Sequence, residues 1–352
     1  MTILRHLDRA QFQLALGVLD MRDPVYLQEL PADVECIDLG CRRVRYSAPA
    51  ILRVVWKRRP QVVFSTLGHL NLAIALMKPL LPSDVTLIAR EAVVVSDVLP
   101  GLTTRSFWTI AYRRLYKRFD QVVCQSHAME RELVEKFGFP AYKATVIHNP
   151  IDIERVRRLA AEPLPEDVPS GWGEGSDTVW LVAAGRLRVE KGFDLLIEAI
   201  ALLKDPRIHV TILGDGPLRD ALMALARERG VADRIELRGF EANPYRFFAR
   251  ASAFALSSRS EAFPNVVLEA LACGTPVIAT PASGGILEIV EGRRGCVIAE
   301  EVSAKSLAGA IAKFATNRMR DGQSPAPPTE FSAERISAEY GKVLSERSWS
   351  AA

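Results

Sequence analysis

The chain has 352 residues, of which 49% are hydrophobic and 25% are charged. This composition is ordinary for a globular protein with room for two cores. The formal net charge of +3 is too small to indicate nucleic-acid binding. No apolar run reaches the roughly 20 residues that a membrane-spanning helix needs. The five cysteines form no CxxC pair and no zinc-ligand spacing, which favours free thiols.

The first half of the chain alternates short apolar, β-branched runs with helical patterns. The clearest helices are predicted at residues 105–119 and 128–137, the second preceded by Ser126 as a helix-capping residue. Strand–helix alternation favours a mostly parallel sheet covered on both faces. Strands are predicted at residues 13–19, 34–39, 61–66, 85–90, 121–125 and 144–147.

Residues 161–177 interrupt this alternation, since they hold three prolines and three glycines and show no periodicity. Beyond them the alternation resumes, and a closing helix is predicted at residues 331–345. The second set of strands is predicted at residues 178–184, 209–213, 234–238, 253–257, 276–280 and 296–298.

These patterns predict an α/β protein with two doubly wound domains that face each other across a cleft, the usual place for a ligand. We expect an N-terminal domain over residues 1–160, a linker over 161–177 and a C-terminal domain over 178–330. The last segment, residues 331–352, is expected to pack back on the first domain.

A loop with two glycines and two cations lies between the strand at 178–184 and the helix that follows it. Gly185 and Gly192 permit close approach of a ligand. Arg186 and Lys191 stand at the carboxyl end of the strand. Together with the positive end of the next helix, these cations suit a diphosphate. Two cations beside a loop are more commonly solvated surface charges, so the pair alone does not define a site.

A second motif is SEAFPNVVLEA at residues 260–270. Glu261 precedes a helix predicted from Asn265 to residue 272, Pro264 favours its first turn, and Glu269 lies inside it. Backbone N–H groups at the start of this helix would point at an anion. Each carboxylate could accept two hydrogen bonds from sugar or ribose hydroxyls. Two glutamates at this spacing also occur by chance on solvated helices.

The order and spacing of four segments resemble the C-terminal domain of glycosyltransferase family 4, the group 1 family of retaining enzymes with the GT-B fold. The resemblance is close over residues 120–315 and weaker over most of 13–119. It implies an N-terminal Rossmann-like domain that binds an acceptor and a C-terminal one that binds a nucleotide-sugar donor. The segments are AAGRLRVEKGFDLLIEAI, VTILGDGPLRDAL, RIELRGF and SRSEAFPNVVLEALACGTPVIATPASGGILEIV.

The resemblance also implies roles for individual residues. Arg186 and Lys191 would bind the donor diphosphate and stabilise it as a leaving group, and Glu261 would contact the donor sugar near the reacting carbon. These three residues are the catalytic candidates. Glu269 would hold the ribose hydroxyls, and the backbone at residues 238–240 would receive the base. The implied donor-binding set is Arg186, Lys191, Arg238, Gly239, Phe240, Glu261, Phe263, Pro264, Asn265, Val266 and Glu269.

Breaking the bond between a sugar and a phosphate builds negative charge on the diphosphate and positive charge on the ring. Fixed charges aimed at these positions stabilise the transition state. No DxD-like pair stands in a plausible position, so we expect no metal and no cofactor. No second carboxylate suited to a double displacement is evident either. The resemblance therefore implies a front-face, retaining transfer in which the leaving phosphate helps to deprotonate the acceptor.

The acceptor half offers fewer signals. Arg90 stands at the carboxyl end of a predicted strand and could meet a phosphate, and His69 follows another strand. His127 could donate or accept a proton, although its place after the helix-capping Ser126 suits a structural role equally well. Arg90, His69 and His127 are the acceptor-site candidates.

Two basic stretches of the first half could lie on an anionic membrane, at roughly 1 kcal/mol per cation. Solvated helix faces are the commoner explanation of such stretches. We expect a cytoplasmic protein, with peripheral contact to the inner face of the membrane as a hypothesis. The stretches are Arg53, Lys57, Arg58 and Arg59, and then Arg113, Arg114, Lys117 and Arg118 beside Trp108, Tyr112 and Tyr116.

Relatives usually begin with a strand and a glycine-rich loop before a helix like the one at residues 4–12. The first domain is therefore expected to lack its usual first strand, through a late start or a truncation that leaves the protein inactive.

The function expected is transfer of a hexosyl or N-acetylhexosaminyl group from a nucleotide-sugar, most simply a UDP-sugar, to a glycan or lipid-linked acceptor. The alternatives are a nucleotide-sugar-binding protein without transfer and a nucleotide-sugar epimerase. No GxGxxG follows a strand near the start, which disfavours a nicotinamide oxidoreductase.

Overall fold

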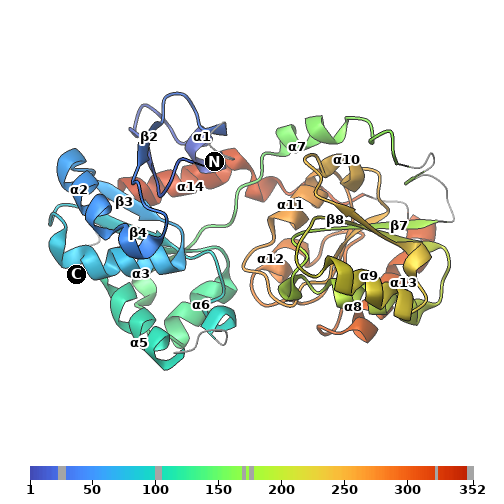
Figure 1. The fold of residues 1–352 in the computed structure, drawn as a ribbon. Helices are drawn as coiled ribbons and strands as arrows, with labels where there is room; N and C mark the ends of the chain where they lie inside the picture. The colour runs from blue at the N-terminus through green and yellow to red at the C-terminus, as the bar shows by residue number, and fades with distance from the viewer. Residues whose placement is uncertain (23–28, 100–104, 169–171, 174–177, 322–323, 347–352) are drawn as a thin grey trace. The chain divides into compact units, whose positions relative to one another are not determined.

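The computed structural model describes residues 1–22, 29–99, 105–168, 172–173, 178–321 and 324–346. The chain forms two compact units, the first made of Met1–Pro150 with Phe331–Ala352 and the second of Ile151–Glu330. Each unit contains parallel strands with helices packed against them (Figure 1). Among the described residues, no helix combines the length and the apolar character needed to cross a bilayer.

The strands of the first unit form two separate parallel sheets. The smaller sheet pairs β1 with β2, and the larger one has the order β3-β4-β5-β6. All four residues of β5 are buried, as expected for a strand covered on both faces. The strands are β1 (Ala15–Val18), β2 (Glu35–Asp38), β3 (Val62–Ser65), β4 (Thr86–Arg90), β5 (Gln121–Cys124) and β6 (Ala144–Val146).

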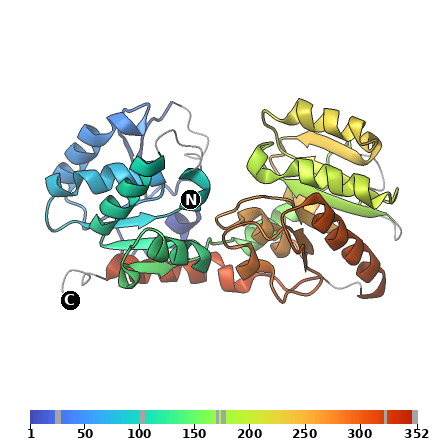
Figure 2. The ribbon, with the colours of Figure 1, turned by 90° about the horizontal axis from the view of Figure 1, so that it is seen from below.

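The helices of the first unit include one from the end of the chain. This last helix, α14, packs on α1 and closes a hydrophobic cluster that Ile336 and Tyr340 share with Ile88 and Val123 of the sheet (Figure 2, red). Burial of these apolar side chains is what holds the distant segment in place. The helices are α1 (Thr2–His6), α2 (Ala48–Arg58), α3 (Gly68–Met77), α4 (Val95–Val98), α5 (Arg105–Leu115), α6 (His127–Glu135) and α14 (Ala333–Ser345).

The second unit is built on one sheet with the strand order β12-β11-β10-β7-β8-β9. Every pairing in it is parallel, so the carboxyl ends of all these strands lie at the same edge. Loops at that edge are where open α/β sheets bind ligands. The strands are β7 (Val179–Ala184), β8 (Ile208–Leu213), β9 (Ile235–Gly239), β10 (Ala253–Leu256), β11 (Val277–Ala279) and β12 (Val297–Ile298).

Helices cover both faces of this sheet. On one side α8 packs against α9 and α13, and on the other α7, α10 and α11 pack together (Figure 1). The arrangement is the doubly wound one expected from the alternation of strands and helices. The helices are α7 (Ile153–Ala160), α8 (Phe193–Leu203), α9 (Arg219–Glu228), α10 (Tyr245–Phe248), α11 (Asn265–Ala272), α12 (Ile286–Val290) and α13 (Ala304–Asp321).

The boundary between the units lies earlier than the sequence suggests. Helix α7, at residues 153–160, belongs to the second unit, because it contacts α10 and α11. Trp172 also departs from a simple linker: it is 4% exposed and packs on Trp180 and Phe247. The remaining positions 169–171 and 174–177 of the expected linker lie outside the described residues. Proline and glycine content alone could not reveal that an indole in this stretch is part of the core.

Candidate functional site

The loop after β7 is fixed against the end of β10. Gly192 has φ +61°, and a Cβ added there would lie 2.1 Å from the carbonyl oxygen of Ser257. The Ser257 hydroxyl donates to the carbonyl of Lys191 over 2.9 Å. Only glycine permits this close packing together with the left-handed backbone. As a result, the backbone of Lys191 lies beside the carboxyl end of β10.

Lys191 and Glu261 form an ion pair at this edge of the sheet. Lysine Nζ lies 2.7 Å from glutamate Oε1, and the hydroxyl of Ser258 donates to the same oxygen over 2.6 Å. The side chains are 25% and 11% exposed, so the charges are only partly hydrated. Arg186 is exposed, and its guanidinium has no ion-pair or hydrogen-bond partner within the part of the chain that the structure describes. An anionic ligand therefore finds one unpaired cation here and one already bound to a carboxylate.

The loop that carries Glu261 is joined to the loop after β11. Ser260 and Ser283 form a parallel bridge, and the Glu261 N–H donates to the Ser283 carbonyl over 3.1 Å. Gly285 N–H donates to the carbonyl of Ala262 over 2.9 Å. These bonds fix the approach to α11, whose first helical residue is Asn265. Pro264 occupies the capping position just before the helix rather than its first turn.

Glu269 lies inside α11 and is largely buried. Its Oε1 accepts a hydrogen bond from the Tyr245 hydroxyl over 3.4 Å. Burial raises the pKa of the Glu269 carboxyl to about 7, only partly offset by the Tyr245 hydrogen bond and the charge of Arg155. Ionisation of this buried carboxyl is costly. A ligand that donates hydrogen bonds to the carboxylate would therefore stabilise its charged form.

The end of β9 presents one exposed aromatic ring. The Phe240 side chain is 81% exposed, which is unusual for a large hydrophobic residue. Arg238 behaves differently, because its guanidinium pairs with Asp167, Glu236 and Glu241 and is 8% exposed. That side chain is engaged within the protein, so only the main chain of Arg238 is left for a ligand.

The other members of the donor-binding set surround the start of α11. Phe263 and Pro264 are buried, Val266 is half-buried and Asn265 is exposed. Within the predicted donor set, the structure shows a direct side-chain contact between Lys191 and Glu261.

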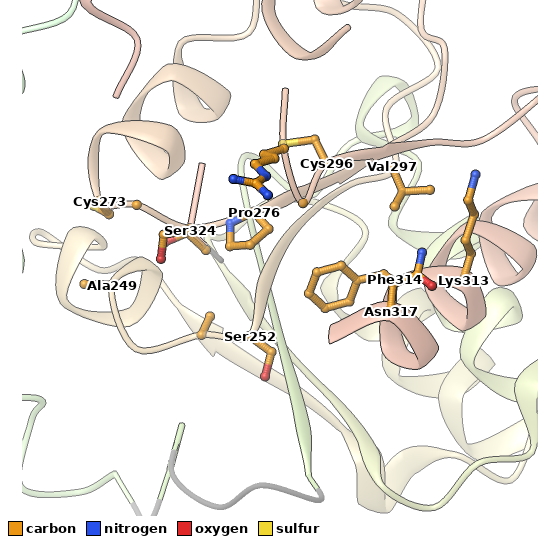
Figure 3. A pocket seen from close by; sticks show the side chains of 15 residues that line it. Ala249, Ser252, Cys273, Pro276, Cys296, Val297, Lys313, Phe314, Asn317 and Ser324 are labelled. Atoms are coloured by element: carbon orange, nitrogen blue, oxygen red, sulfur yellow. The ribbon is translucent and has the colours of Figure 1, made fainter. Parts of the chain in front are cut away.

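One cavity of the second unit is not part of this site. It measures about 510 Å³ and is lined by residues that precede three strands, among them Ser252, Pro276 and Cys296 (Figure 3). These positions lie at the amino ends of β10, β11 and β12. Because the strands are parallel, the cavity is at the edge opposite to Lys191 and Glu261.

The acceptor-site candidates lie in the first unit. Arg90 ends β4, and its Nη2 donates to Asn149 Oδ1 over 2.5 Å. His69 is exposed in the first turn of α3. His127 begins α6. Its side chain is 59% exposed, and its Nδ1 lies 3.5 Å from Glu130 Oε2. Ser126 caps that helix through a hydrogen bond from the Met129 N–H, which confirms the capping interpretation.

Two polar groups of the donor region and one buried carboxyl in the first unit are not among the predicted site residues. Ser258 and Tyr245 hold the two candidate glutamates. Glu91 follows Arg90 and is 2% exposed. Ser258 and Glu91 both follow a buried strand, which is a usable signal for residues near a ligand edge. Tyr245 carried no such signal, because its contact depends on how α10 packs against α11.

Comparison with known families accounts for both units. The family described as Glycosyl transferases group 1 matches residues 168–326, and Glycosyltransferase Family 4 matches residues 1–155. Among curated relatives, an N-acetylgalactosamine-N,N'-diacetylbacillosaminyl-diphospho-undecaprenol 4-alpha-N-acetylgalactosaminyltransferase from Campylobacter jejuni is 33% identical over 175 residues, covering 50% of this chain and 45% of that protein. The lipopolysaccharide core biosynthesis glycosyltransferase LpsE from Rhizobium meliloti is 30% identical over 237 residues, covering 66% of each. The matches thus span less than two thirds of these relatives' lengths.

Solved structures resemble the chain over nearly its whole length. A glycosyltransferase from Rickettsia africae superposes with a TM-score of 0.78 at 16% identity, covering 99% of this chain and 94% of that one. Anabaena HepE, solved in complex with UDP, superposes with a TM-score of 0.72 at 20% identity, covering 94% and 91%. At such low identity the similarity establishes the fold, which is GT-B with two Rossmann-like units.

Proposed function

We propose a specific transfer reaction for this chain, which belongs to glycosyltransferase family 4, within the group 1 glycosyl transferases. The reaction is retaining transfer of a sugar from a UDP-sugar to a glycan or lipid-linked acceptor. The second unit would bind the donor and the first unit the acceptor. The observation that carries the proposal is the convergence of Lys191 and Glu261 at the carboxyl ends of β7 and β10, with Arg186 on the same loop.

The two cations suit a diphosphate leaving group. As the bond between the anomeric carbon and the diphosphate oxygen breaks, negative charge grows on the nucleoside diphosphate, and Arg186 and Lys191 would stabilise it there. Lys191 must then turn part of its interaction from Glu261 to phosphate. This exchange leaves the Glu261 carboxylate free to accept hydrogen bonds from the donor sugar.

The other bonds of the reaction follow from the same arrangement. The acceptor hydroxyl oxygen would attack the anomeric carbon on the face that the diphosphate leaves, and its proton would pass to a phosphate oxygen of the leaving group. Glu269 would accept hydrogen bonds from the ribose, and Phe240 offers an exposed ring on which a base can stack.

The relatives support the choice of substrates. The name of the Campylobacter protein describes transfer to a diphospho-undecaprenol-linked sugar, and LpsE is named for lipopolysaccharide core biosynthesis. HepE was solved with UDP. We therefore propose a UDP-sugar of the hexose or N-acetylhexosamine type as donor and an envelope polysaccharide or glycolipid as acceptor.

Contact with an anionic membrane would suit a lipid-linked acceptor. Helix α5 carries Arg113 and Arg114 in its last turn, and the same helix exposes Phe107 and Ile110, which are 63% and 52% exposed. Exposed apolar side chains among cations are the composition of interfacial helices. At low salt, the wild type should co-sediment with phosphatidylglycerol vesicles, and the Phe107→Ser/Ile110→Ser variant should stay in the supernatant. Equal sedimentation of the two would remove α5 from the proposal.

The test of the transfer function combines binding and turnover. UDP-, GDP- and ADP-sugars are screened by thermal shift, since a ligand that binds only the folded state raises its melting temperature. Acceptor-dependent release of UDP is then measured for Lys191→Ala and Glu261→Ala, each expected to lose on the order of 10²-fold. Lys313→Ala and Glu300→Ala, which replace exposed residues of the same unit, serve as matched controls.

The outcomes separate the competing functions. Wild-type release in both site variants would refute the site. Binding of UDP without release of UDP from any donor would favour a nucleotide-sugar-binding protein. Conversion of the donor sugar without an acceptor, detected as an epimeric UDP-sugar, would favour an epimerase.

A further inference from the structure

The first unit buries a carboxyl group that the proposed transfer does not use. Glu91 follows β4 directly and extends its pairing with β5, because its N–H donates to the Val123 carbonyl over 2.9 Å. The residue is 2% exposed. Removing a carboxyl from water is unfavourable unless hydrogen bonds replace the lost hydration. The partners of Glu91 therefore indicate what the chain gains from it.

Those partners come from the loop itself and from a distant helix. The Tyr116 hydroxyl donates to Oε2, and the Ala92 N–H donates to Oε1 over 3.1 Å. The Gln125 side chain donates to the Glu91 carbonyl over 3.0 Å. Within the described residues no Lys or Arg pairs with the carboxyl, and burial raises its pKa to about 7. Glu91 therefore acts through hydrogen bonds rather than through an ion pair.

The hydrogen bonds around Glu91 and Tyr116 form a buried network that extends to the end of β3. Asn71 donates to the Tyr116 hydroxyl over 3.3 Å and to the Arg90 carbonyl over 3.1 Å. The Ser65 hydroxyl donates to Asn71 Oδ1 over 2.6 Å. Buried side chains thus connect the end of β3, the end of β4 and the residue after β5. Fully paired buried networks of this kind rigidify the segments that they join.

The loop after β3 also packs directly on these groups. A Cβ added to Gly68 would lie 2.6 Å from the Tyr112 hydroxyl and 3.4 Å from Glu91 Oε1. The backbone at Gly68 therefore packs closely against the side chains of Glu91 and Tyr112. His69 is the next residue along the chain.

Each acceptor-site candidate adjoins a member of this network. Arg90 precedes Glu91, His69 follows Gly68, and His127 comes two residues after Gln125. The three strands are parallel, so these loops leave the same edge of the sheet. One buried carboxyl is thus connected to the backbone of all the loops that carry the candidates.

We propose that Glu91 is a positioning residue, which fixes the loops after β3, β4 and β5 from inside the first unit so that acceptor-binding side chains are held in place. The inference rests on the proposed function in assigning an acceptor to this edge. At 2% exposure Glu91 itself is not placed to touch a substrate. Loss of its hydrogen bonds would loosen the loops while leaving the donor-binding unit intact, since the hydrogen-bond partners Ala92, Tyr116 and Gln125 all belong to the first unit.

The experiment compares Glu91→Gln and Tyr116→Phe with Glu132→Gln. Glu132 is the matched control, because it is also a buried glutamate of the first unit, 8% exposed, and accepts a backbone hydrogen bond from Ser96 over 3.2 Å. Hydrogen exchange followed by mass spectrometry should quicken in residues 65–70, 90–94 and 125–128 of both Glu91→Gln and Tyr116→Phe. The Glu132 variant should leave these segments unchanged.

A kinetic readout distinguishes positioning from mere stability. With the UDP-sugar that gives the largest thermal shift and an envelope glycolipid extract as acceptor, acceptor-dependent UDP release should fall by about 10-fold or more in Glu91→Gln. Acceptor-independent hydrolysis of the same donor and the thermal shift caused by UDP should match the wild type.

Two results would overturn the inference: loop exchange equal to that of the Glu132 variant, or an unchanged acceptor-dependent rate in a wild type that transfers sugar. The exchange measurement needs no substrate. It therefore tests the link between Glu91 and the loops even where the proposed transfer fails, and the two failures are distinguishable.

Discussion

A Cβ placed on Gly284 would lie 1.8 Å from the carbonyl oxygen of Glu261. Gly284 also has φ +99°, a conformation that residues with side chains rarely adopt. The loop after β11 therefore reaches the backbone of Glu261 only because residue 284 has no side chain.

Gly284→Ala should consequently displace the Glu261 loop and destabilise the second unit by about 2–4 kcal/mol. Urea unfolding and donor turnover measure the two effects. Gly309→Ala is the control, because Gly309 is exposed within α13 and has open space around it. That change should stabilise the protein by about 0.5–1 kcal/mol. Equal stabilities of the two variants would contradict the crowding seen at Gly284.

Glu269 should make stability depend on pH. Its folded pKa of about 7 is above the value of 4.5 for an unperturbed glutamate. The folded state then binds the extra proton between these pH values, so the free energy of unfolding falls as pH rises from about 4.5 to 7. The loss is on the order of 3 kcal/mol. Chemical unfolding of Glu269→Gln across this range should give a flatter dependence of the unfolding free energy on pH, and a slope equal to that of the wild type would contradict the prediction.

Glu91→Gln should flatten the same pH dependence in the same direction, because burial also raises the pKa of Glu91 to about 7.

The same carboxyl should make donor binding depend on pH with the opposite sense. Ribose hydroxyls donate to the ionised form of Glu269, so UDP affinity should weaken as pH is lowered below about 7. Calorimetric titration of UDP into Glu269→Gln should show weaker binding that varies less with pH. A wild-type affinity that is constant from pH 5 to 8 would separate Glu269 from the ribose.

Phe240 should contribute to nucleotide binding without contributing to stability. Its ring is 81% exposed, so Phe240→Ala removes little buried surface. Loss of base stacking should weaken UDP binding by about 0.5–1.5 kcal/mol, which is roughly 2- to 10-fold. Phe107→Ala, an exposed ring of the first unit, should leave the affinity unchanged. A Phe240 variant that melts lower but binds UDP normally would show that the ring packs rather than stacks.

Arg238 should matter for stability through its three carboxylate partners. Arg238→Met leaves Glu241, whose side chain is 13% exposed, with Arg246 as its remaining cation. A loss of about 2–3 kcal/mol in urea unfolding is expected. Arg229→Met is the matched control, since its pair with Glu198 is exposed and should contribute less than about 1 kcal/mol. Equal effects of the two changes would refute the structural role of Arg238.

Sequence patterns predicted the fold well where periodicity and strand length agree. The helix expected at residues 265–272 is found at those residues, and all six strands expected in the first unit are present. Packing between distant segments could not be predicted in this way. Neither the place of α7 in the second unit nor the burial of Trp172 follows from local composition, because both depend on contacts with α10 and its neighbours.

The candidate site divides along the same line. Glycine and charge spacing drew attention to Lys191 and Glu261, the family resemblance made them site candidates, and the structure brings these two side chains into contact. Spacing could not indicate that the Arg238 guanidinium is paired with carboxylates. Two of the three carboxylates belong to Asp167 and Glu241, and no sequence pattern relates either residue to Arg238. Nor could it single out Glu91, whose importance comes from Tyr116, 25 residues further along the chain.

The separation of β1 and β2 from the larger sheet of the first unit has a consequence for local opening. A ladder of two four-residue strands has little cooperative support of its own, since isolated pairs of strands are marginal in water. Backbone amides of β1 should therefore lose their protection long before those of β5, and limited proteolysis should nick the chain near β1 while the rest of the unit remains folded.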